Sequence, residues 1–405
     1  MLAMSTDDAF RWHPALLRAV ELMHAELPDA EDLPDLLPAT GIGDTEALER
    51  MSPHVLGKAS ALDDPLALAH MDPPTPWITW AMAMWNARLN QNLLHPGTSA
   101  FASRAETCVI DWLKPFFGMS GGQFCAGSSL ANLTALWAAR DAGGVDSVVA
   151  SDAAHLSVQK SAKILGLPFR SIPVDAGEQV NAARLGDLSS ACLVLTAGTT
   201  VTGSVDNLDL IGQARWSHVD AAWAGALRFT EHHAQLLDGI DNADSVALSA
   251  HKWLFQPKDS ALVLFKDNEA ARAATGVSGS YLANANVGVQ GSRGAAAVPL
   301  MATLLAWGQS GLSARIEATM AMAEKLANAV DSDPRLELWS RPITGITVFR
   351  PLQSTAETLL RKLPVGMFSS GSVGGDSWLR SVAANPLADL DAIVEVLHNS
   401  LAETQ

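Results

Sequence analysis

The pattern of apolar and polar positions changes its period along the chain, and the changes divide the chain into three parts. Apolar side chains recur at helical spacing over residues 9–27, 77–94 and 102–117, and we predict a further helix at 45–51. Residues 27–40 are rich in Pro and Asp and are predicted to form a loop. The N-terminal stretch up to residue 51 is too small to fold alone, so we expect it to pack on a larger body.

Between residues 120 and 266, short apolar runs alternate with helical patterns. The predicted strands are 147–150, 191–196, 218–220, 245–248 and 261–265, and the predicted helices between them are 130–141, 156–165 and 208–215. Strands that alternate with helices indicate an α/β fold with a parallel sheet covered on both faces. Ligands of such sheets bind at the carboxyl ends of the strands.

After residue 297 the pattern changes again, to a long Ala-rich helix over 297–330 with a break predicted near Gly308 and Gly311. Strands are predicted at 336–340, 345–349 and 378–382, and helices at 354–363 and 387–401. These elements indicate a small α+β domain. We therefore predict an N-terminal helical segment at 1–64, a large α/β domain at 65–310 and a C-terminal domain at 311–405.

Composition narrows the possible functions. The net charge of −16 argues against nucleic acid and an anionic membrane surface as partners, because both require a basic face. Cys108, Cys125 and Cys192 form no C-x-x-C pair, so we expect buried thiols in a reducing compartment and neither a disulfide nor a metal site. The chain has no signal-peptide pattern at its start and no long purely apolar run, which predicts a cytoplasmic protein without a membrane span.

Two charged residues stand at the ends of apolar strands: Asp220 in His-Val-Asp-Ala-Ala and Lys252 in Ser-Ala-His-Lys-Trp. Burying a lone charge is costly unless it is paired or neutralised. A lysine in a Schiff base loses its charge, and an aspartate that faces a pyridinium nitrogen gains a cationic partner, which is the protein side of pyridoxal phosphate (PLP) chemistry. Alternatively, the lysine lies on the surface and the aspartate forms a turn or caps a helix.

The residues upstream support the cofactor interpretation. Gly127, Ser128 and Ser129 precede a helix, where free N–H groups and hydroxyls suit a phosphate, although a plain helix cap is the alternative. His155 follows a strand and could stack on a cofactor ring or serve as an acid or base, or it could be structural. Thr199 and Thr200 end another strand and could bind a phenolic oxygen or form a turn.

In this order the motifs resemble those of the group II PLP-dependent decarboxylases, which include the aromatic-amino-acid, glutamate and diaminobutyrate decarboxylases. The resemblance spans roughly residues 65–390 and includes five more segments: Ala105-Glu106, Trp112-Leu113, Tyr281-Leu282, Gly291-Ser292-Arg293 and Asn385-Pro386. It implies the fold type I architecture, a mainly parallel seven-stranded sheet, and a homodimer with the active site at the subunit interface.

The resemblance also implies a role for each motif residue. Lys252 would form the Schiff base, Asp220 would hold the ring nitrogen, and His155 would stack on the ring, so that an amino acid loses carbon dioxide through a quinonoid intermediate. The remaining cofactor contacts would come from Ser128, Ser129, Ser249 and His251 at the phosphate, Thr200 at the ring hydroxyl and Ala222 under the ring.

The chain departs from the family pattern in one loop. Many members carry a proton-donating tyrosine there, whereas residues 283–290 contain none and Tyr281 precedes the loop. His155 or water is left as the proton donor. We therefore retain two alternatives. The first is a PLP enzyme with another outcome, namely oxidative deamination, aldol-type cleavage or transamination, and the second is a family member that does not turn over substrate.

The substrate is left open. Arg104 could bind an acidic side chain or lie on the surface, while Trp77 and Phe101 could line an aromatic pocket.

Overall fold

The computed structural model describes residues 9–280, 282 and 285–402, and it divides the chain into two compact units, residues 1–61 and 62–405. The first unit contains helices α1 (Ala15–Leu22) and α2 (Asp44–Val55). An ion pair between Arg18 and Glu49, 2.9 Å long, joins these two helices. The predicted boundaries after residues 64 and 310 stay predictions.

The second unit is built on a seven-stranded sheet in the order β1-β7-β6-β5-β4-β2-β3. Only β7 runs against its neighbours, so the predicted mainly parallel α/β sheet of fold type I is confirmed. The strands are β1 (Gly121–Cys125), β2 (Ser147–Ser151), β3 (Phe169–Ile172), β4 (Ala191–Thr196), β5 (Trp216–Asp220), β6 (Ser245–Ser249) and β7 (Ala261–Phe265). The sequence analysis did not predict β1 and β3.

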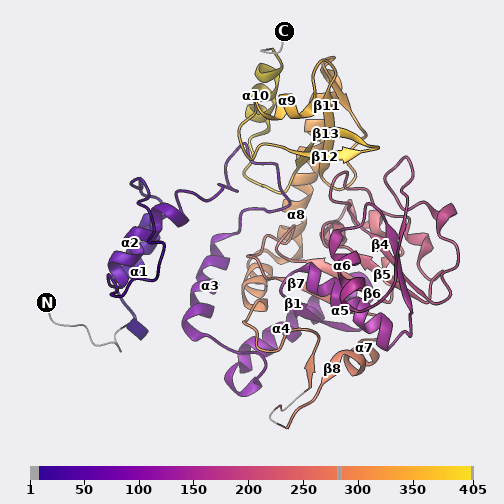
Figure 1. Cartoon of the computed structure of the whole chain (residues 1–405), viewed down its shortest axis with the longest axis horizontal. Helices are drawn as coiled ribbons and strands as arrows, with labels where there is room; N and C mark the ends of the chain where they lie inside the picture. Colours follow the sequence, from indigo (N-terminus) through magenta and orange to yellow (C-terminus); the bar gives the residue numbers. More distant parts are fainter. Residues whose placement is uncertain (1–8, 281, 283–284, 403–405) are drawn as a thin grey trace. The chain divides into compact units, whose positions relative to one another are not determined.

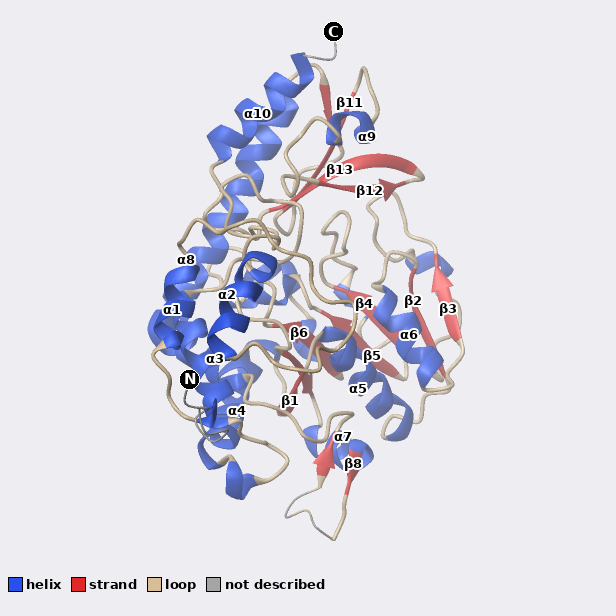
Figure 2. Cartoon of the chain, turned by 60° about the vertical axis from the view of Figure 1, so that its left-hand side comes forward, coloured by secondary structure: helices blue, strands red, loops and turns tan. Residues whose placement is uncertain are grey.

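Helices cover both faces of this sheet (Figure 2). Because side chains alternate along a strand, Val149 and Leu193 join a core with α4 (Ala100–Leu113) and α8 (Ala297–Ser332). Their neighbours Val148 and Cys192 face the other core, which contains α5 (Ser128–Asp141), α6 (Leu156–Ile164) and α7 (Asn268–Thr275). Alanines dominate the buried face of α5, so its backbone lies close to the strand ends.

Helix α8 runs from the large sheet to a second sheet of four strands (Figure 1). Its predicted break is confirmed at Gly308, whose φ of 62° is not helical. The second sheet has the order β10-β11-β13-β12. Its elements are β10 (Leu336–Leu338), β11 (Ile346–Pro351), β12 (Ser369–Val373) and β13 (Asp376–Val382), with helices α9 (Ala356–Leu360) and α10 (Leu390–Ala402). The predicted α+β character of this region is confirmed, and β12 was not predicted.

Some predicted helices were wrong or too long. Residues 208–215 contain only the 3-10 turn η5 (Leu208–Leu210), because Asn207 caps the N–H of Asp209 and Gly212 follows with a positive φ. Helix α3 (Trp77–Leu89) ends before residue 94, because Asn90 adopts a left-handed conformation. None of the described helices combines the length and apolarity needed to cross a membrane.

Candidate active site

The carboxyl ends of neighbouring strands bring the predicted charged residues together. Thr196 at the end of β4 pairs in register with Asp220 at the end of β5, and Asp220 pairs with Ala247 of β6. Strand β6 ends two residues later at Ser249, and the turn that follows carries His251 and Lys252. Residues that are far apart in sequence therefore lie at one edge of the sheet, as the parallel topology predicts.

Asp220 is buried and fully hydrogen-bonded. Its Oδ2 accepts a hydrogen bond of 2.8 Å from Asn132 Nδ2, and its Oδ1 accepts one of 3.2 Å from the backbone N–H of Ala222. Ala222 itself is buried. These donors fix the orientation of the carboxylate, so Asp220 can face a cation bound at this edge.

The Lys252 amine lies in surroundings that disfavour its charge. Burial lowers the pKa of Lys252, while the nearby negative charges of Asp220 and Asp72 oppose this shift. The positive charges of Lys258 and Arg380 lower the pKa further. A lowered pKa increases the fraction of neutral amine, which is the nucleophilic form.

A pair of stacked indoles anchors the segment that carries Lys252. The rings of Trp253 and Trp223 lie 4.2 Å apart at an interplanar angle of 11°. Trp253 Nε1 donates to Thr319 Oγ1 of α8, and Trp223 Nε1 donates to the carbonyl of Thr344 beside β11. The turn after β6 is therefore fixed to the C-terminal sheet as well as to the large sheet.

The predicted phosphate residues converge on the start of α5. Gly127 precedes α5 with a φ of 98°, and a Cβ placed on it would lie 3.8 Å from His251 Cε1. Ser128 is half-buried and Ser129 is exposed. Within the described residues, the buried atoms Ser249 Oγ and His251 Nδ1 have no hydrogen-bond partner.

His155 caps helix α6 at the end of β2. Its Nδ1 accepts a hydrogen bond of 3.2 Å from the Ser157 N–H and lies 2.8 Å from Ser157 Oγ. Burial lowers the pKa of His155, against the opposing effect of Asp220. Thr200 is exposed, whereas its neighbour Thr199 is buried and bonded to the hydroxyl of Thr202.

Two residues of this region were missed by the sequence analysis. Asn132 on α5 bonds Asp220 directly, and Arg380 on β13 is 8% exposed with its Nε lacking a partner among the described residues. Burial lowers the pKa of Arg380 to about 10. An arginine inside the apolar strand Trp378-Leu379-Arg380-Ser381-Val382 was a signal of the same kind as Lys252, and it was overlooked.

The substrate residues considered from sequence receive less support. Arg104 is exposed on α4, and Trp77 and Phe101 are exposed as well. Tyr281 and part of the 283–290 loop lie outside the described residues.

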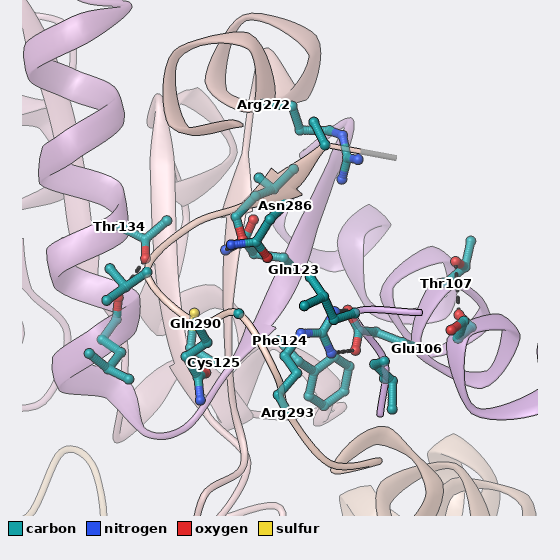
Figure 3. Close-up of a pocket in the computed structure, with 18 of the residues that line it drawn as sticks. Glu106, Thr107, Gln123, Phe124, Cys125, Thr134, Arg272, Asn286, Gln290 and Arg293 are labelled. Carbon is teal, nitrogen blue, oxygen red and sulfur yellow. Dashed lines mark hydrogen bonds and ion pairs between the residues drawn. The ribbon is translucent and has the colours of Figure 1, made fainter. Parts of the chain in front are cut away.

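A separate polar cavity of about 210 Å³ adjoins β1 (Figure 3). Arg293 forms a two-pronged ion pair with Glu106 there, and Gln290 accepts a hydrogen bond of 2.8 Å from the N–H of Ala126. The contact between Gln290 and Ala126 connects the end of the 283–290 loop to the turn at Gly127.

The family model described as the pyridoxal-dependent decarboxylase conserved domain matches residues 57–351. The chain belongs to this family. It is 29% identical to the L-2,4-diaminobutyrate decarboxylase of Rhizobium meliloti (strain 1021), over 91% of this chain and 84% of that protein. It is 26% identical to the aspartate 1-decarboxylase of Aliivibrio fischeri, over 78% and 69% of the two chains.

The fold agrees with a solved structure from the same functional class. The structure of Oryza sativa TDC with PLP and tryptamine covers 100% of this chain, with a TM-score of 0.88 at 21% identity. The predicted family, cofactor and enzyme class are therefore confirmed, and this decarboxylase is a PLP-dependent amino acid carboxy-lyase.

The residues present fit the cofactor. Ser249 Oγ and His251 Nδ1 are buried and have no partner in the described part of the chain, so both can bind phosphate oxygens. Burial lowers the pKa of His251 to about 4, so this imidazole is neutral near pH 7 and can donate one hydrogen bond. Asp220 and Lys252 are a carboxylate and an amine of the kind that the opposite end of PLP would require.

Proposed function

We propose that Lys252, Asp220 and His155 are the catalytic groups of this decarboxylase and that Lys252 binds PLP covalently. The observation that carries the proposal is the convergence of a buried carboxylate and a charge-disfavoured amine at the ends of β5 and β6. When bound, PLP supplies a pyridinium ring that accepts the electron pair released with carbon dioxide.

Each residue would contribute its own chemistry. Lys252 would attack as a neutral amine, and Asp220 would keep the ring nitrogen protonated through its charge. His155 would contact the cofactor as a neutral imidazole, because burial lowers its pKa. The other cofactor contacts would come from Gly127, Ser128, Ser129, Ser249 and His251 at the phosphate, and from Thr200 and Ala222 at the ring.

We propose further that Arg380 binds a carboxylate of the amino acid substrate. Its guanidinium is buried, its charge acts on Lys252, and Asp72 acts on it in turn. Within the described residues its one side-chain hydrogen bond runs from NH1 to Ser369 Oγ at 3.3 Å. A buried guanidinium without a paired anion favours a carboxylate ligand, since the two groups match in charge and geometry. The α-carboxylate and an acidic side chain share this chemistry.

A second copy of the chain is the proposed partner. The α3 side chains Trp77, Trp80 and Trp85 are 70%, 47% and 56% exposed, which leaves an aromatic face open to contact. We expect Trp85→Glu to shift sedimentation from dimer toward monomer. Val365→Glu is the control, because Val365 is fully exposed in the connection between α9 and β12, and this change should leave the dimer intact.

The proposed location is the cytoplasm. Cys108, Cys125 and Cys192 are free thiols, and burial raises the pKa of Cys125 to about 12, which keeps it protonated. Free thiols support a reducing compartment. Cell fractionation with an antibody to the chain would test this location, and recovery from a secreted fraction would contradict it.

The test of the catalytic assignment combines trapping with product analysis. Borohydride reduction of the PLP-loaded protein followed by peptide mapping should find the cofactor on Lys252, and label on Lys258 instead would overturn the assignment. Purified protein should release carbon dioxide and the matching amine from one member of an amino acid panel that includes 2,4-diaminobutyrate, aspartate and tryptophan. Release of an aldehyde and ammonia would contradict simple decarboxylation.

A further inference from the structure

A chain of buried hydrogen bonds connects Asp220 to His155 and contains residues that the catalytic assignment does not use. Alternation along β5 puts Trp216, His218 and Asp220 on one face of the strand, opposite α5. Asn132 of α5 lies at the centre of the chain and is completely buried. Its Nδ2 donates to Asp220 Oδ2 at 2.8 Å and to Ser157 Oγ at 2.9 Å, and its Oδ1 lies 3.0 Å from His218 Nε2.

The directions of these hydrogen bonds follow from the two end groups, a donor at Trp216 and an acceptor at Asp220. The indole of Trp216 can only donate, and it donates to Ser245 Oγ at 2.9 Å. The ionised carboxylate of Asp220 can only accept, so the amide of Asn132 must turn its nitrogen toward Asp220 and its oxygen toward His218. His218 therefore carries its proton on Nε2, and its Nδ1 accepts from the Ser245 hydroxyl at 2.9 Å, the shorter of its two contacts, the other being the Ser245 carbonyl at 3.2 Å.

The second branch ends at His155. Ser157 Oγ accepts a hydrogen from Asn132, which leaves its own hydrogen free for His155 Nδ1 at 2.8 Å. The N–H of Ser157 points at the same ring nitrogen. Two donors thus face Nδ1, so a proton there would meet like-oriented dipoles, and the ring keeps its single proton on Nε2.

We propose that Asn132 and Ser157 are positioning residues that act on two catalytic groups: Asn132 directs a hydrogen-bond donor at Asp220, and through Ser157 it keeps His155 neutral with its proton on Nε2. His155 then faces the cofactor as a hydrogen-bond donor, and it cannot act as a cationic acid. The inference rests on the proposed function where it calls these groups catalytic, whereas the protonation and tautomer of His155 can be measured without turnover. The charged groups that face His155 are Asp220 and Lys252.

Asn132→Asp tests the proposal because it keeps the shape and reverses the hydrogen bonds. The new carboxyl group lies beside Asp220, and the two share one proton because both cannot ionise at this distance. With that proton held between them, the oxygen at position 132 can only accept from Ser157, whose oxygen is then left to accept from His155 Nδ1. The histidine side-chain nitrogens can be observed by NMR in protein labelled with 15N-histidine, with His155→Gln used to assign the resonances. Wild-type His155 should be neutral with Nε2 protonated at pH 8, and it should take up a second proton at a lower pH than a free histidine, both with PLP and without it.

In Asn132→Asp, His155 should carry a proton on Nδ1. The ratio of the Nδ1-protonated to the Nε2-protonated form should rise by about tenfold or more, the equivalent of one hydrogen bond. Ser157→Ala should shift that equilibrium in the same direction, and Ser157→Thr should restore the wild-type spectrum. Thr134→Val is the matched control, because Thr134 is equally buried on α5 and its hydroxyl bonds the Leu130 carbonyl and the Cys125 thiol, neither of which contacts Asn132 or Ser157 in these hydrogen bonds.

An unchanged His155 spectrum in Asn132→Asp and in Ser157→Ala would overturn the proposal. The same would follow from an equal change in Thr134→Val, since the effect would then be one of general packing. Failure of the catalytic assignment has a different signature: the tautomer would respond as expected, while borohydride labels a lysine other than Lys252.

Discussion

A single methyl group at Gly345 should weaken both the fold and cofactor binding. Gly345 has a φ of 74°, and a Cβ placed there would lie 2.9 Å from Trp253 Cζ2 and 3.0 Å from Cη2. Trp253 is fully buried and stacked on Trp223, so its indole has no room to move away. Because Trp253 directly follows Lys252, any displacement of the indole also displaces the amine.

The magnitude has two parts. The left-handed backbone conformation costs an alanine about 1–2 kcal/mol, and overpacking a rigid core costs a further 1–3 kcal/mol or so. Gly345→Ala should therefore lower the free energy of unfolding by about 2–5 kcal/mol. Gly366→Ala is the matched control, since Gly366 has a φ of 90° but nothing lies within 4 Å of its added Cβ. The control should lose only the backbone part.

The assay is urea unfolding of both variants and the wild type, followed by tryptophan fluorescence, together with PLP affinity from equilibrium dialysis. Gly345→Ala should be less stable than Gly366→Ala by about 1–3 kcal/mol and should bind PLP at least tenfold more weakly, if a misplaced anchor costs as much as one lost hydrogen bond. Equal stability of the two variants would refute the reasoning about Trp253. Normal PLP affinity in a destabilised Gly345→Ala would refute its connection to Lys252.

Three further predictions concern the charged groups. Asp220→Asn should lower kcat by about a hundredfold or more, because it removes the charge proposed to face the ring nitrogen, and carbon dioxide release within tenfold of wild type would contradict that role. Arg380→Lys should raise KM for all amino acids if Arg380 binds the α-carboxylate, or for acidic ones alone if it binds a side chain; no change, or an equal change in the exposed Arg104→Ala, would reject both. The folded apoprotein holds His251 neutral with a pKa of about 4. The contribution of His251 to stability is therefore complete above about pH 6.5 and is lost as the pH falls toward 4, where the unfolded chain takes up the proton first. Urea midpoints of His251→Gln should depend less on pH in this window than those of wild type, and parallel profiles would contradict the shift.

The sequence was sufficient for groups whose position follows from topology. Asp220 and Lys252 stand at the ends of apolar strands, and parallel strands bring such ends to one edge, so their proximity could be predicted without knowing any contact. Strands β1 and β3 escaped prediction for compositional reasons. The first begins Gly121-Gly122-Gln123, and the second contains Arg170 and Ser171 at a half-exposed edge, so neither forms a continuous apolar run.

The contacts that define the site in detail could not be predicted in the same way. Asn132 lies 88 residues from Asp220 in the chain, and it reads as an ordinary polar residue of α5. Arg380 reaches the region from a different sheet, and its importance depends on burial that a sequence pattern does not give. Thr200 illustrates the reverse case, since its motif predicted a cofactor contact and its side chain is exposed in the isolated chain.

The distribution of charge at the site explains why these residues depend on one another. Asp220 is hydrogen-bonded and Arg380 forms no ion pair within the described residues, although Asp72 acts on its charge, and Lys252 responds to both groups. Burial lowers the pKa of Lys252 most, Asp220 and Asp72 raise it, and Lys258 and Arg380 lower it, so Asp220 and Arg380 are two of the several groups that set the fraction of neutral amine. Removing Asp220 should therefore lower the pKa of Lys252 and removing Arg380 should raise it, apart from any direct contact of either residue with cofactor or substrate. A substrate carboxylate bound at Arg380 would neutralise its charge, so the Lys252 amine, whenever it is free of the cofactor, should have a higher pKa with the amino acid bound than without it.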